Sequence, residues 1–462
     1  MNCSEKINKY IDEHTEDMLR DLKGLMQINS AAQLGADSLP FGKGSAQALE
    51  YIRRLAENIG MQTENFENYV VTADFGSGAP TLGILAHVDV VPQGEGWTKP
   101  CFDLTLENGR VYGRGAIDDK GPAVASLYAV KAIKELGIPL KSSVRYIFGG
   151  GEELGCEDIE YYSSKNKLPE CVITPDGEFP IVNAEKGMAH ITAKKSFTEG
   201  SAVIAKITCK GAVNAVPAKA QAVLCGCSAG DVYKAIEAAK TSAEFTVTES
   251  GGVVEIISHG KSAHGSRPQL GVNALTALVK VLGILGIKEC AVLSNLFPFE
   301  ETDGASLGIN FSDEVSGSTT LAFTVCEMNE DGCEISLDCR FPVSRTVNEV
   351  VGGIEKALSA SGYEITHKQT MEAHHVDENS PFIDALKRAY ERVTGEKARC
   401  VCETGVTYAH TMPQGVAFGA MEQGEDCNMH SADEYIELKQ LKKVAEIFAN
   451  AIIEICKTEG NI

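Results

Sequence analysis

The 462-residue chain lacks basic residues relative to acidic ones. Lys and Arg total 42 against 64 Asp and Glu, which gives a formal net charge of -22 at pH 7. No run of basic residues stands out that could neutralise phosphates, so we exclude nucleic acid as a partner. The chain also lacks an uninterrupted apolar run of about 18 residues and an apolar segment near its start. We therefore expect neither a membrane span nor a secretory signal.

The cysteines lack the spacing of a metal-binding or disulfide framework. There are 15 of them, an odd number, with no Cys-x-x-Cys pair and two Cys-x-Cys pairs, Cys225/Cys227 and Cys400/Cys402. This usage is typical of reduced, buried thiols, so we expect a cytoplasmic protein.

Hydrophobic periodicity predicts alternating helices and strands in the first part of the chain. Apolar residues recur at three- and four-residue steps from Glu5 to Met26, the spacing of one helix face. Further helices are expected over 45–58 and 122–136. The strands expected here are Tyr69–Phe75, Thr81–Ala86, Val144–Phe148 and Cys171–Thr174. This alternation predicts an α/β fold with a mostly parallel sheet flanked by helices.

The pattern changes after about Lys186. Alternating apolar and polar residues predict antiparallel strands at 188–194, 202–209, 245–248, 253–258, 320–326 and 334–340. Helices are expected at 231–240, 272–285 and 347–361. Past about Glu378, helix, strand and helix are expected at 381–393, 415–419 and 438–456. We therefore expect a discontinuous α/β domain, 1–185 and 379–462, interrupted by an inserted α+β domain, 186–378, with two similar lobes as one option.

Several expected strands end in chemically active residues, and functional groups gather at strand carboxyl ends in α/β sheets. One strand runs into His87, and Asp89 lies two residues further on the same side, where it could hydrogen-bond His87 and fix its tautomer. Asp118 and Asp119 stand before a helix start, where helix capping is an alternative to metal binding. Asp176 follows a fourth strand and by itself is an ordinary turn acid.

Glu152 and Glu153 follow a strand that ends in three glycines. Two adjacent carboxylates are costly to bury unpaired. A dinuclear metal site resolves this cost, because one carboxylate binds metal while its neighbour accepts a proton from the attacking water. A solvated acidic turn is the alternative. His430, which precedes the last helix, completes a mixed His, Asp and Glu set that suits zinc and related divalent ions.

Other catalytic motifs are absent or misplaced. The chain has no His-Glu-x-x-His motif, and Gly-x-Ser-x-Gly occurs twice, around Ser228 and Ser306. A serine nucleophile of this motif requires a strand-to-helix elbow, and both serines fall in the expected insertion, which disfavours a serine hydrolase.

The ordered segments HVDVVP, GRGAIDDKG, GGGEELG, TPDGEFP, GKSAHGSRPQLGVNA and MHSADEY resemble the M20 family of dinuclear metallopeptidases over essentially the whole chain. Within that family the chain is most similar to the PepV-type bacterial dipeptidases, which act on dipeptides without marked specificity or on Xaa-His dipeptides. The similarity lies in the length, the long insertion and the segments NAVPAKA, LDCRFPV and TYAHTMPQGVAFG. The resemblance implies a metal-dependent dipeptidase, a hydrolase whose inserted domain is a lid over the metal-binding catalytic domain.

The resemblance also implies a role for each matching residue. It makes His87 and Asp176 ligands of one metal, Glu153 and His430 ligands of the other, and Asp118 the bridge, with Asp119 a neighbour. It makes Glu152 the general base, with Asp89 in the catalytic set. In the lid, His264 would steady the oxyanion, and Asn214 and Arg340 would hold substrate, as would Gly405 and Thr407 near the C-terminal part.

Some expectations stay open at this stage. The segment that commonly reads Gly-Gly-Thr-Tyr-Ala-Arg in similar enzymes has Val406 and His410 at the changed positions, which affects the expected substrate preference. The metals are expected to be two divalent ions, zinc first, with manganese or cobalt as options. An N-acyl amino acid amidohydrolase could use the same site, and a non-catalytic peptide-binding protein is a remote alternative. The resemblance to enzymes with a doubled lid implies a monomer.

Overall fold

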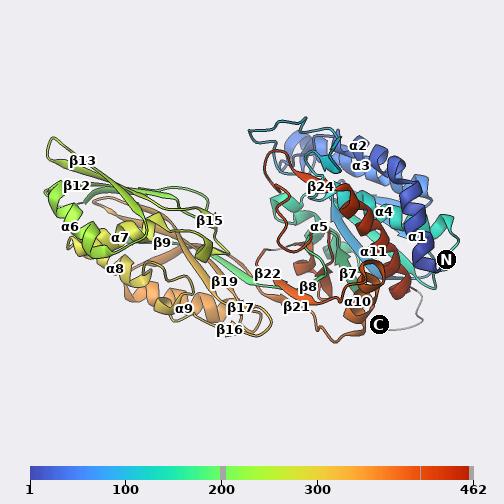
Figure 1. Cartoon of the computed structure of the whole chain (residues 1–462). Helices are drawn as coiled ribbons and strands as arrows, with labels where there is room; N and C mark the ends of the chain where they lie inside the picture. The colour runs from blue at the N-terminus through green and yellow to red at the C-terminus, as the bar shows by residue number, and fades with distance from the viewer. Residues whose placement is uncertain (198–203, 406, 457–462) are drawn as a thin grey trace. The chain divides into compact units, whose positions relative to one another are not determined.

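The described residues, 1–197, 204–405 and 407–456 of a computed structural model, divide into two units (Figure 1). The first unit comprises 1–183, 376–401 and 407–456, and the second comprises the described part of 184–375 together with 402–405. The chain thus leaves the first unit and returns to it, as an insertion does. The attachment of 402–405 to the second unit was not indicated by any sequence pattern.

The large sheet has parallel strands at its centre. Its strand order is β1 (Gln62–Phe66), β2 (Val70–Phe75), β6 (Ser143–Gly149), β3 (Pro80–His87), β7 (Cys171–Thr174), β23 (Gly415–Ala417), β8 (Ile181–Glu185) and β21 (His374–His375), with β22 (Cys400–Glu403) also paired to β8. The pairs β6–β3, β3–β7 and β7–β23 are parallel, whereas β1–β2, β2–β6, β23–β8 and β8–β21 are antiparallel. The predicted α/β class is confirmed, and the antiparallel strands lie toward the edges.

Alternate residues of the central strands enter two different cores. Ile84 and Tyr146 pack into the larger core, while Leu85 and Ile147 pack into a smaller one on the other side. This follows from the two-residue period of a strand, whose side chains point alternately to opposite faces. The helices of the first unit are α1 (Cys3–Glu13), α2 (Thr15–Met26), α3 (Gly42–Ile59), α4 (Lys120–Glu135), α5 (Glu157–Lys165), α10 (Pro381–Thr394) and α11 (Leu438–Cys456). The larger core contains residues of all of these except α5.

The single helix expected from Glu5 to Met26 is wrong in one respect, because the structure ends α1 at Glu13 and starts α2 at Thr15. His14, between them, has φ -111° and ψ 15°, outside the helical range. Its Nδ1 lies 2.8 Å from the Tyr10 carbonyl oxygen, and the Thr15 hydroxyl donates to the Ile11 carbonyl at 2.9 Å. These side chains engage backbone carbonyls near the break, a competition that hydrophobic spacing does not reveal.

The second unit contains an antiparallel sheet with helices against one face. Its strand order is β13 (Glu244–Ser250), β14 (Val253–His259), β12 (Lys219–Cys225), β10 (Ile204–Cys209), β18 (Thr320–Met328), β19 (Gly332–Phe341), β9 (Gly187–Ser196) and β20 (Glu364–Met371). Helices α6 (Ala229–Ala239), α7 (Ala274–Ile284), α8 (Lys288–Leu296) and α9 (Val347–Ala360) share its core with alternate strand residues. The expected antiparallel strands are therefore present; residues 202 and 203 of one of them lie outside the described residues.

Short elements connect the larger ones. They are η1 (Ala36–Ser38), β4 (Thr105–Glu107), β5 (Arg110–Tyr112), η2 (Glu152–Leu154), β11 (Ala215–Val216), β15 (Ala263–His264), η3 (Pro268–Leu270), η4 (Ala305–Leu307), β16 (Ser312–Asp313), β17 (Gly317–Ser318), η5 (Tyr408–Thr411) and β24 (Tyr435–Glu437).

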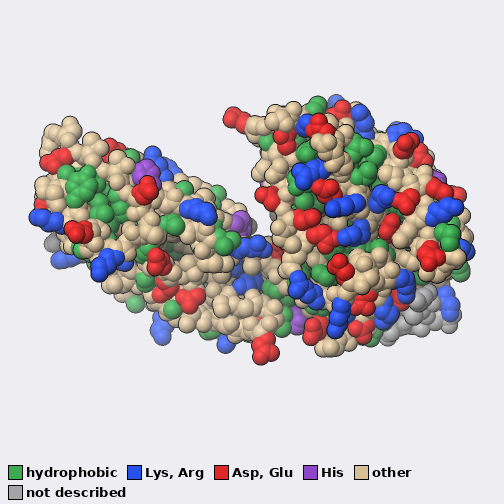
Figure 2. Space-filling view, in the orientation of Figure 1, with side chains coloured by type: hydrophobic (Ala, Val, Ile, Leu, Met, Phe, Trp, Pro, Cys, Tyr) green, Lys and Arg blue, Asp and Glu red, His purple; other side chains and the backbone are tan. Residues whose placement is uncertain are grey.

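The surface carries charges of both signs. Figure 2 shows acidic and basic side chains interspersed over the visible face of each unit. In the described part of the chain, all cysteines have free thiols, and no helix combines the length and apolar character needed to cross a bilayer.

Candidate metal centre

Three segments bring acids and a histidine to one edge of the large sheet. His87 is the last residue of β3, Glu152 and Glu153 lie on η2 just after β6, and Asp176 follows β7 by two residues. Strands β6, β3 and β7 are adjacent and parallel, so their carboxyl ends meet at the same edge. His87 is fully buried, and its Nε2 lies 3.6 Å from Asp176 Oδ2.

Asp118 lies between two histidines that are distant in sequence. Its Oδ1 is 2.9 Å from His87 Nε2, and its Oδ2 is 2.8 Å from His430 Nε2. His430 Nε2 is also 3.4 Å from Glu153 Oε1. Each carboxylate oxygen of Asp118 therefore faces a different imidazole, which is the arrangement required of a bridging ligand.

The converging side chains form two groups of potential ligands. One group is His87, Glu152 and Asp176, and the other is Asp118, Glu153 and His430; within each group the donor atoms lie within 4.8 Å of one another. All five side chains expected to bind metal are thus brought together, with Glu152 beside them. The four carboxylates carry four negative charges when ionised, the charge that two divalent cations would balance.

The hydrogen-bonding state of the site fits a metal centre. Among the described residues, the buried atoms His87 Nε2 and Glu153 Oε1 make no hydrogen bond of acceptable geometry, despite their close approaches to neighbouring groups. Buried polar atoms are rarely left without a partner. Both atoms are ligand types that zinc and similar ions accept, so these residues fit a pair of divalent ions.

The pKa values reflect a crowded and buried acidic cluster. Burial raises the pKa of Glu152 well above its ordinary value, and nearby Asp176 and Glu153 raise it further. Burial also raises the pKa of Asp176 and of Glu153. The neighbouring carboxylates of Asp118 and Glu153, which face the His430 ring, raise its pKa to about 11. Negative charge here is therefore costly unless a positive charge, from a proton or a metal ion, accompanies it.

Asp89 differs from its expected arrangement. The Asp89 backbone carbonyl accepts a hydrogen bond from His87 Nδ1 at 3.1 Å, while its carboxylate is 3.5 Å away. The carbonyl thus specifies the tautomer with Nε2 free for a ligand. The carboxylate instead accepts the backbone N–H groups of Glu152 at 3.2 Å and Glu153 at 3.1 Å. Where the chain leaves β3, the Asp89 carbonyl oxygen lies nearer the His87 ring than the Asp89 carboxylate does. The two-residue spacing in the sequence did not reveal this difference.

Two further buried carboxylates hold the ligand-bearing loops. Asp119 Oδ2 accepts the backbone N–H of His87 at 3.1 Å. Glu434 forms an ion pair with Arg114 and accepts the N–H groups of Ile117 at 3.2 Å and Asp118 at 3.4 Å. Sequence reasoning assigned no role to Glu434. Its position in MHSADEYIEL, within a segment that supplies a candidate ligand, is the signal that could have identified it.

The remaining candidate residues fall mostly in the second unit. His264 on β15 is paired with Ala215, next to Asn214, and its Nδ1 lies 2.7 Å from the Ser266 hydroxyl oxygen. Burial and the Arg340 charge lower the pKa of His264, which favours its neutral form. Arg340 donates to Asp338 at 2.9 Å and to the Thr404 carbonyl, next to Gly405, at 3.2 Å.

Thr407 belongs to the first unit. Its hydroxyl caps η5 by accepting the Ala409 N–H at 3.1 Å. Of the two departures from the usual segment, Val406 lies outside the described residues, and His410 lies on η5.

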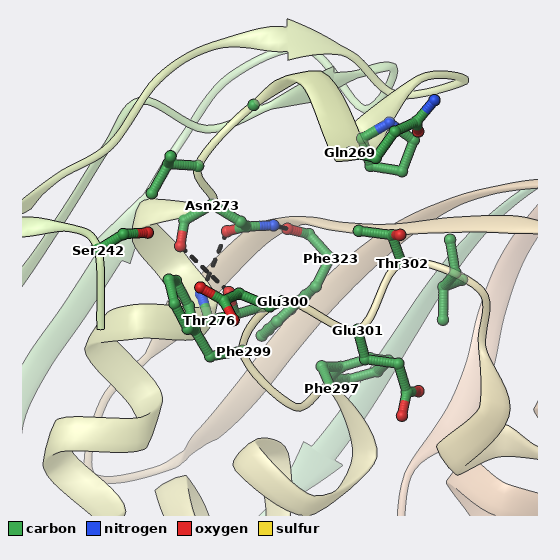
Figure 3. A pocket seen from close by; sticks show the side chains of 14 residues that line it. Ser242, Gln269, Asn273, Thr276, Phe297, Phe299, Glu300, Glu301, Thr302 and Phe323 are labelled. Carbon is green, nitrogen blue, oxygen red and sulfur yellow. Dashed lines mark hydrogen bonds between the residues drawn. The ribbon is translucent and has the colours of Figure 1, made fainter. Parts of the chain in front are cut away.

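A cavity of about 310 Å³ lies in the second unit, between the start of α7 and the loop after α8 (Figure 3). Its floor includes the buried rings of Phe297 and Phe323. Asn273 caps α7 by accepting the N–H groups of Leu275 and Thr276. None of the converging acids and histidines lines this cavity, so the chemistry-bearing site is the cluster at the sheet edge.

The two Gly-x-Ser-x-Gly serines have structural roles. Ser228 accepts the Asp231 N–H and is the N-cap of α6, and Ser306 donates to Glu301 at 2.8 Å. Ser228 follows β12 and precedes α6, but its hydroxyl donates to Asp231 Oδ2 at 2.7 Å and caps that helix. Ser306 lies on η4 rather than on a strand-to-helix elbow.

Comparison with known proteins shows the family and the fold of the chain. The model of peptidase family M20/M25/M40 matches residues 83–454. The chain is 32% identical over 456 residues to a beta-Ala-Xaa dipeptidase of Lactobacillus delbrueckii subsp. lactis, covering 96% of each protein. Human carnosine dipeptidase 1 shares the fold with a TM-score of 0.61, 16% identity and coverage of 99% of this chain and 100% of that one. Aminoacylhistidine dipeptidase of Vibrio alginolyticus does so with a TM-score of 0.58, 14% identity and coverage of 96% and 97%.

Proposed function

Since the chain belongs to peptidase family M20/M25/M40, we propose that this enzyme hydrolyses the peptide bond of dipeptides with two divalent metal ions. The observation that carries this proposal is Asp118, whose two carboxylate oxygens face His87 and His430 at 2.9 and 2.8 Å. The name of one relative, a beta-Ala-Xaa dipeptidase, supports a dipeptide substrate. The broad or Xaa-His preference expected from the sequence resemblance remains part of this proposal. Zinc is the first choice of metal, with manganese or cobalt accepted by the same donors.

The residues divide between metal binding and proton transfer. His87 and Asp176 would hold one ion, Glu153 and His430 the other, and Asp118 would contact both. Bound divalent ions lower the pKa of a water molecule and polarise the substrate carbonyl.

Glu152 would accept a proton from the attacking water at a carboxylate oxygen and deliver it to the amine nitrogen as the C–N bond breaks. Burial raises the pKa of Glu152, which makes this carboxylate a stronger proton acceptor than an exposed one. We assign the expected roles in the second unit in the same way: His264 donates to the developing oxyanion, and Asn214 and Arg340 hold substrate. The neutral form of His264, with Nδ1 engaged by Ser266, leaves Nε2 as the candidate donor.

Substitution of Glu152 by Gln tests the central assignment. As a base, Glu152 is dispensable for metal binding, so Glu152→Gln should retain about two ions per chain while kcat falls about 100- to 10,000-fold. If Glu152 instead acts as a ligand beside His87 and Asp176, the variant would lose one ion. Near-native turnover would remove the general-base assignment.

The substrate class is tested by assaying free dipeptides beside N-acetyl amino acids on the metal-loaded wild-type enzyme. Hydrolysis of dipeptides is expected. A chain that cleaves N-acetyl amino acids and leaves dipeptides intact would be an amidohydrolase, which would overturn the proposed substrate.

A further inference from the structure

A buried pair of side chains, Asp158 and Tyr408, is hydrogen-bonded through Asp158 to the backbone of the loop that carries Glu152 and Glu153. The Gly151 N–H, immediately before Glu152, donates to Asp158 Oδ2 at 2.8 Å. The Tyr408 hydroxyl donates to the same oxygen, while Asp158 Oδ1 accepts the Ile159 N–H at 2.7 Å. Both side chains are fully buried.

This pair has little freedom to move. The Tyr408 ring packs among Leu85, Ile147 and Tyr162 in the smaller core of the first unit. A Cβ at Gly149 would lie 2.0 Å from the Tyr408 hydroxyl oxygen and 2.3 Å from Asp158 Oδ2, so the glycine allows the pair to approach the strand end. Hydrogen bonds to an ionised, buried acceptor are stronger than neutral ones.

Three consecutive amides are therefore fixed by two carboxylates. Asp158 holds the N–H of Gly151, and Asp89 holds those of Glu152 and Glu153. The direction of the Glu152 side chain depends on this backbone, because η2 is a single turn with few bonds of its own.

From this chain of contacts we propose that Tyr408 is a positioning residue for Glu152, acting through Asp158 and the Gly151 amide. The inference rests on the proposed role of Glu152. Tyr408 lies 256 residues from Glu152 in sequence and was not among the candidate site residues, and its ring stands edge-on to His87 at 6.2 Å between ring centroids. Tyr408→Phe keeps that ring and removes the hydroxyl alone.

The matched control is Tyr162→Phe. Tyr162 belongs to the same buried cluster, but its hydroxyl accepts from Arg145 at 3.2 Å and does not contact the loop. In the metal-loaded enzyme, Tyr408→Phe should lower kcat about tenfold with KM and metal content close to wild type. Tyr162→Phe should leave kcat within about twofold.

A double-mutant cycle identifies the route. If Tyr408 acts through Asp158, Tyr408→Phe should change kcat by less than about twofold in an Asp158→Asn background. Additive losses, equal losses in both tyrosine variants, or a Tyr408→Phe enzyme with wild-type kcat would each overturn the proposal.

Amide hydrogen exchange at Gly151 separates this proposal from the proposed function. Tyr408→Phe should speed exchange at Gly151 about tenfold in the metal-loaded chain, and Tyr162→Phe should not. If wild type cleaves no dipeptide, the proposed function fails, yet this measurement still decides whether the pair holds the loop. Unchanged exchange at Gly151 in Tyr408→Phe would reject the proposal that Tyr408 holds the loop, even if the enzyme is an active dipeptidase.

Discussion

Replacing Asp89 by Asn tests whether the loop of Glu152 and Glu153 must be held by a charge. The Asp89 carboxylate is fully buried and accepts one backbone N–H on each oxygen, at 3.2 and 3.1 Å. In the Asp89→Asn variant an NH₂ group replaces one of these acceptors and faces an N–H donor. One hydrogen bond to a charged group, worth about 1.5 to 3 kcal/mol, is lost, and the other becomes neutral.

The expected effect on turnover follows from these values. If the loss displaces Glu152 from the geometry of the transition state, then about 1.4 kcal/mol per factor of ten predicts a fall in kcat of roughly 10- to 150-fold. The His87 tautomer should persist, because the backbone carbonyl of residue 89 accepts from Nδ1. Metal content should therefore stay near two ions per chain. Steady-state kinetics on a dipeptide and metal analysis of the purified variant provide both measurements.

Asp313→Asn is the matched control. Asp313 accepts the N–H groups of Val315 at 3.0 Å and Ser316 at 2.6 Å in a turn of the second unit, so its substitution disturbs a similar carboxylate–amide arrangement. It should cost stability without lowering kcat. An Asp89→Asn enzyme with kcat within about twofold of wild type would refute the reasoning, and loss of metal in parallel with kcat would mean that Asp89 supports a ligand rather than the base.

Three more results are expected. His264→Ala should lower kcat about 100- to 1,000-fold with little change in metal content, and an unchanged kcat would remove its oxyanion role. Gly149→Ala should reduce the free energy of unfolding by about 1 to 3 kcal/mol, because an added Cβ has no space there. Gly352→Ala is the control: it lies in α9 with nothing within 4 Å of an added Cβ, so it should increase the free energy of unfolding by about 0.5 to 1 kcal/mol. Denaturant unfolding measures both variants. In the metal-stripped chain, the raised pKa of His430, about 11 when folded against about 6.5 unfolded, contributes stability that is full below pH 6.5 and is lost as pH rises toward 11. His430→Gln should flatten that part of the stability–pH profile, and a profile identical to wild type would contradict the ion pairs of His430.

The sequence by itself determined the α/β class, the strands that lead to His87 and to Asp176, and the residue types of the metal centre. These features are local: a strand shows its buried faces as a periodicity, and catalytic acids follow it within a few positions. Together with the family resemblance, this local information named the six side chains of the two groups of potential ligands. The sequence did not predict the helix break at His14. There the side chains of His14 and Thr15 engage backbone carbonyls of the preceding helix, an interaction that hydrophobic spacing does not show.

The tertiary structure decided how these side chains are supported. Asp158 and Tyr408 are 250 residues apart, and Glu434 holds amides more than 300 residues away, so no local pattern could pair them. It also decided that Asp89 reaches His87 through its carbonyl and uses its carboxylate on the neighbouring loop. Such contacts arise because parallel strands from separate parts of the chain end at one edge, where buried amides and carboxylates satisfy one another.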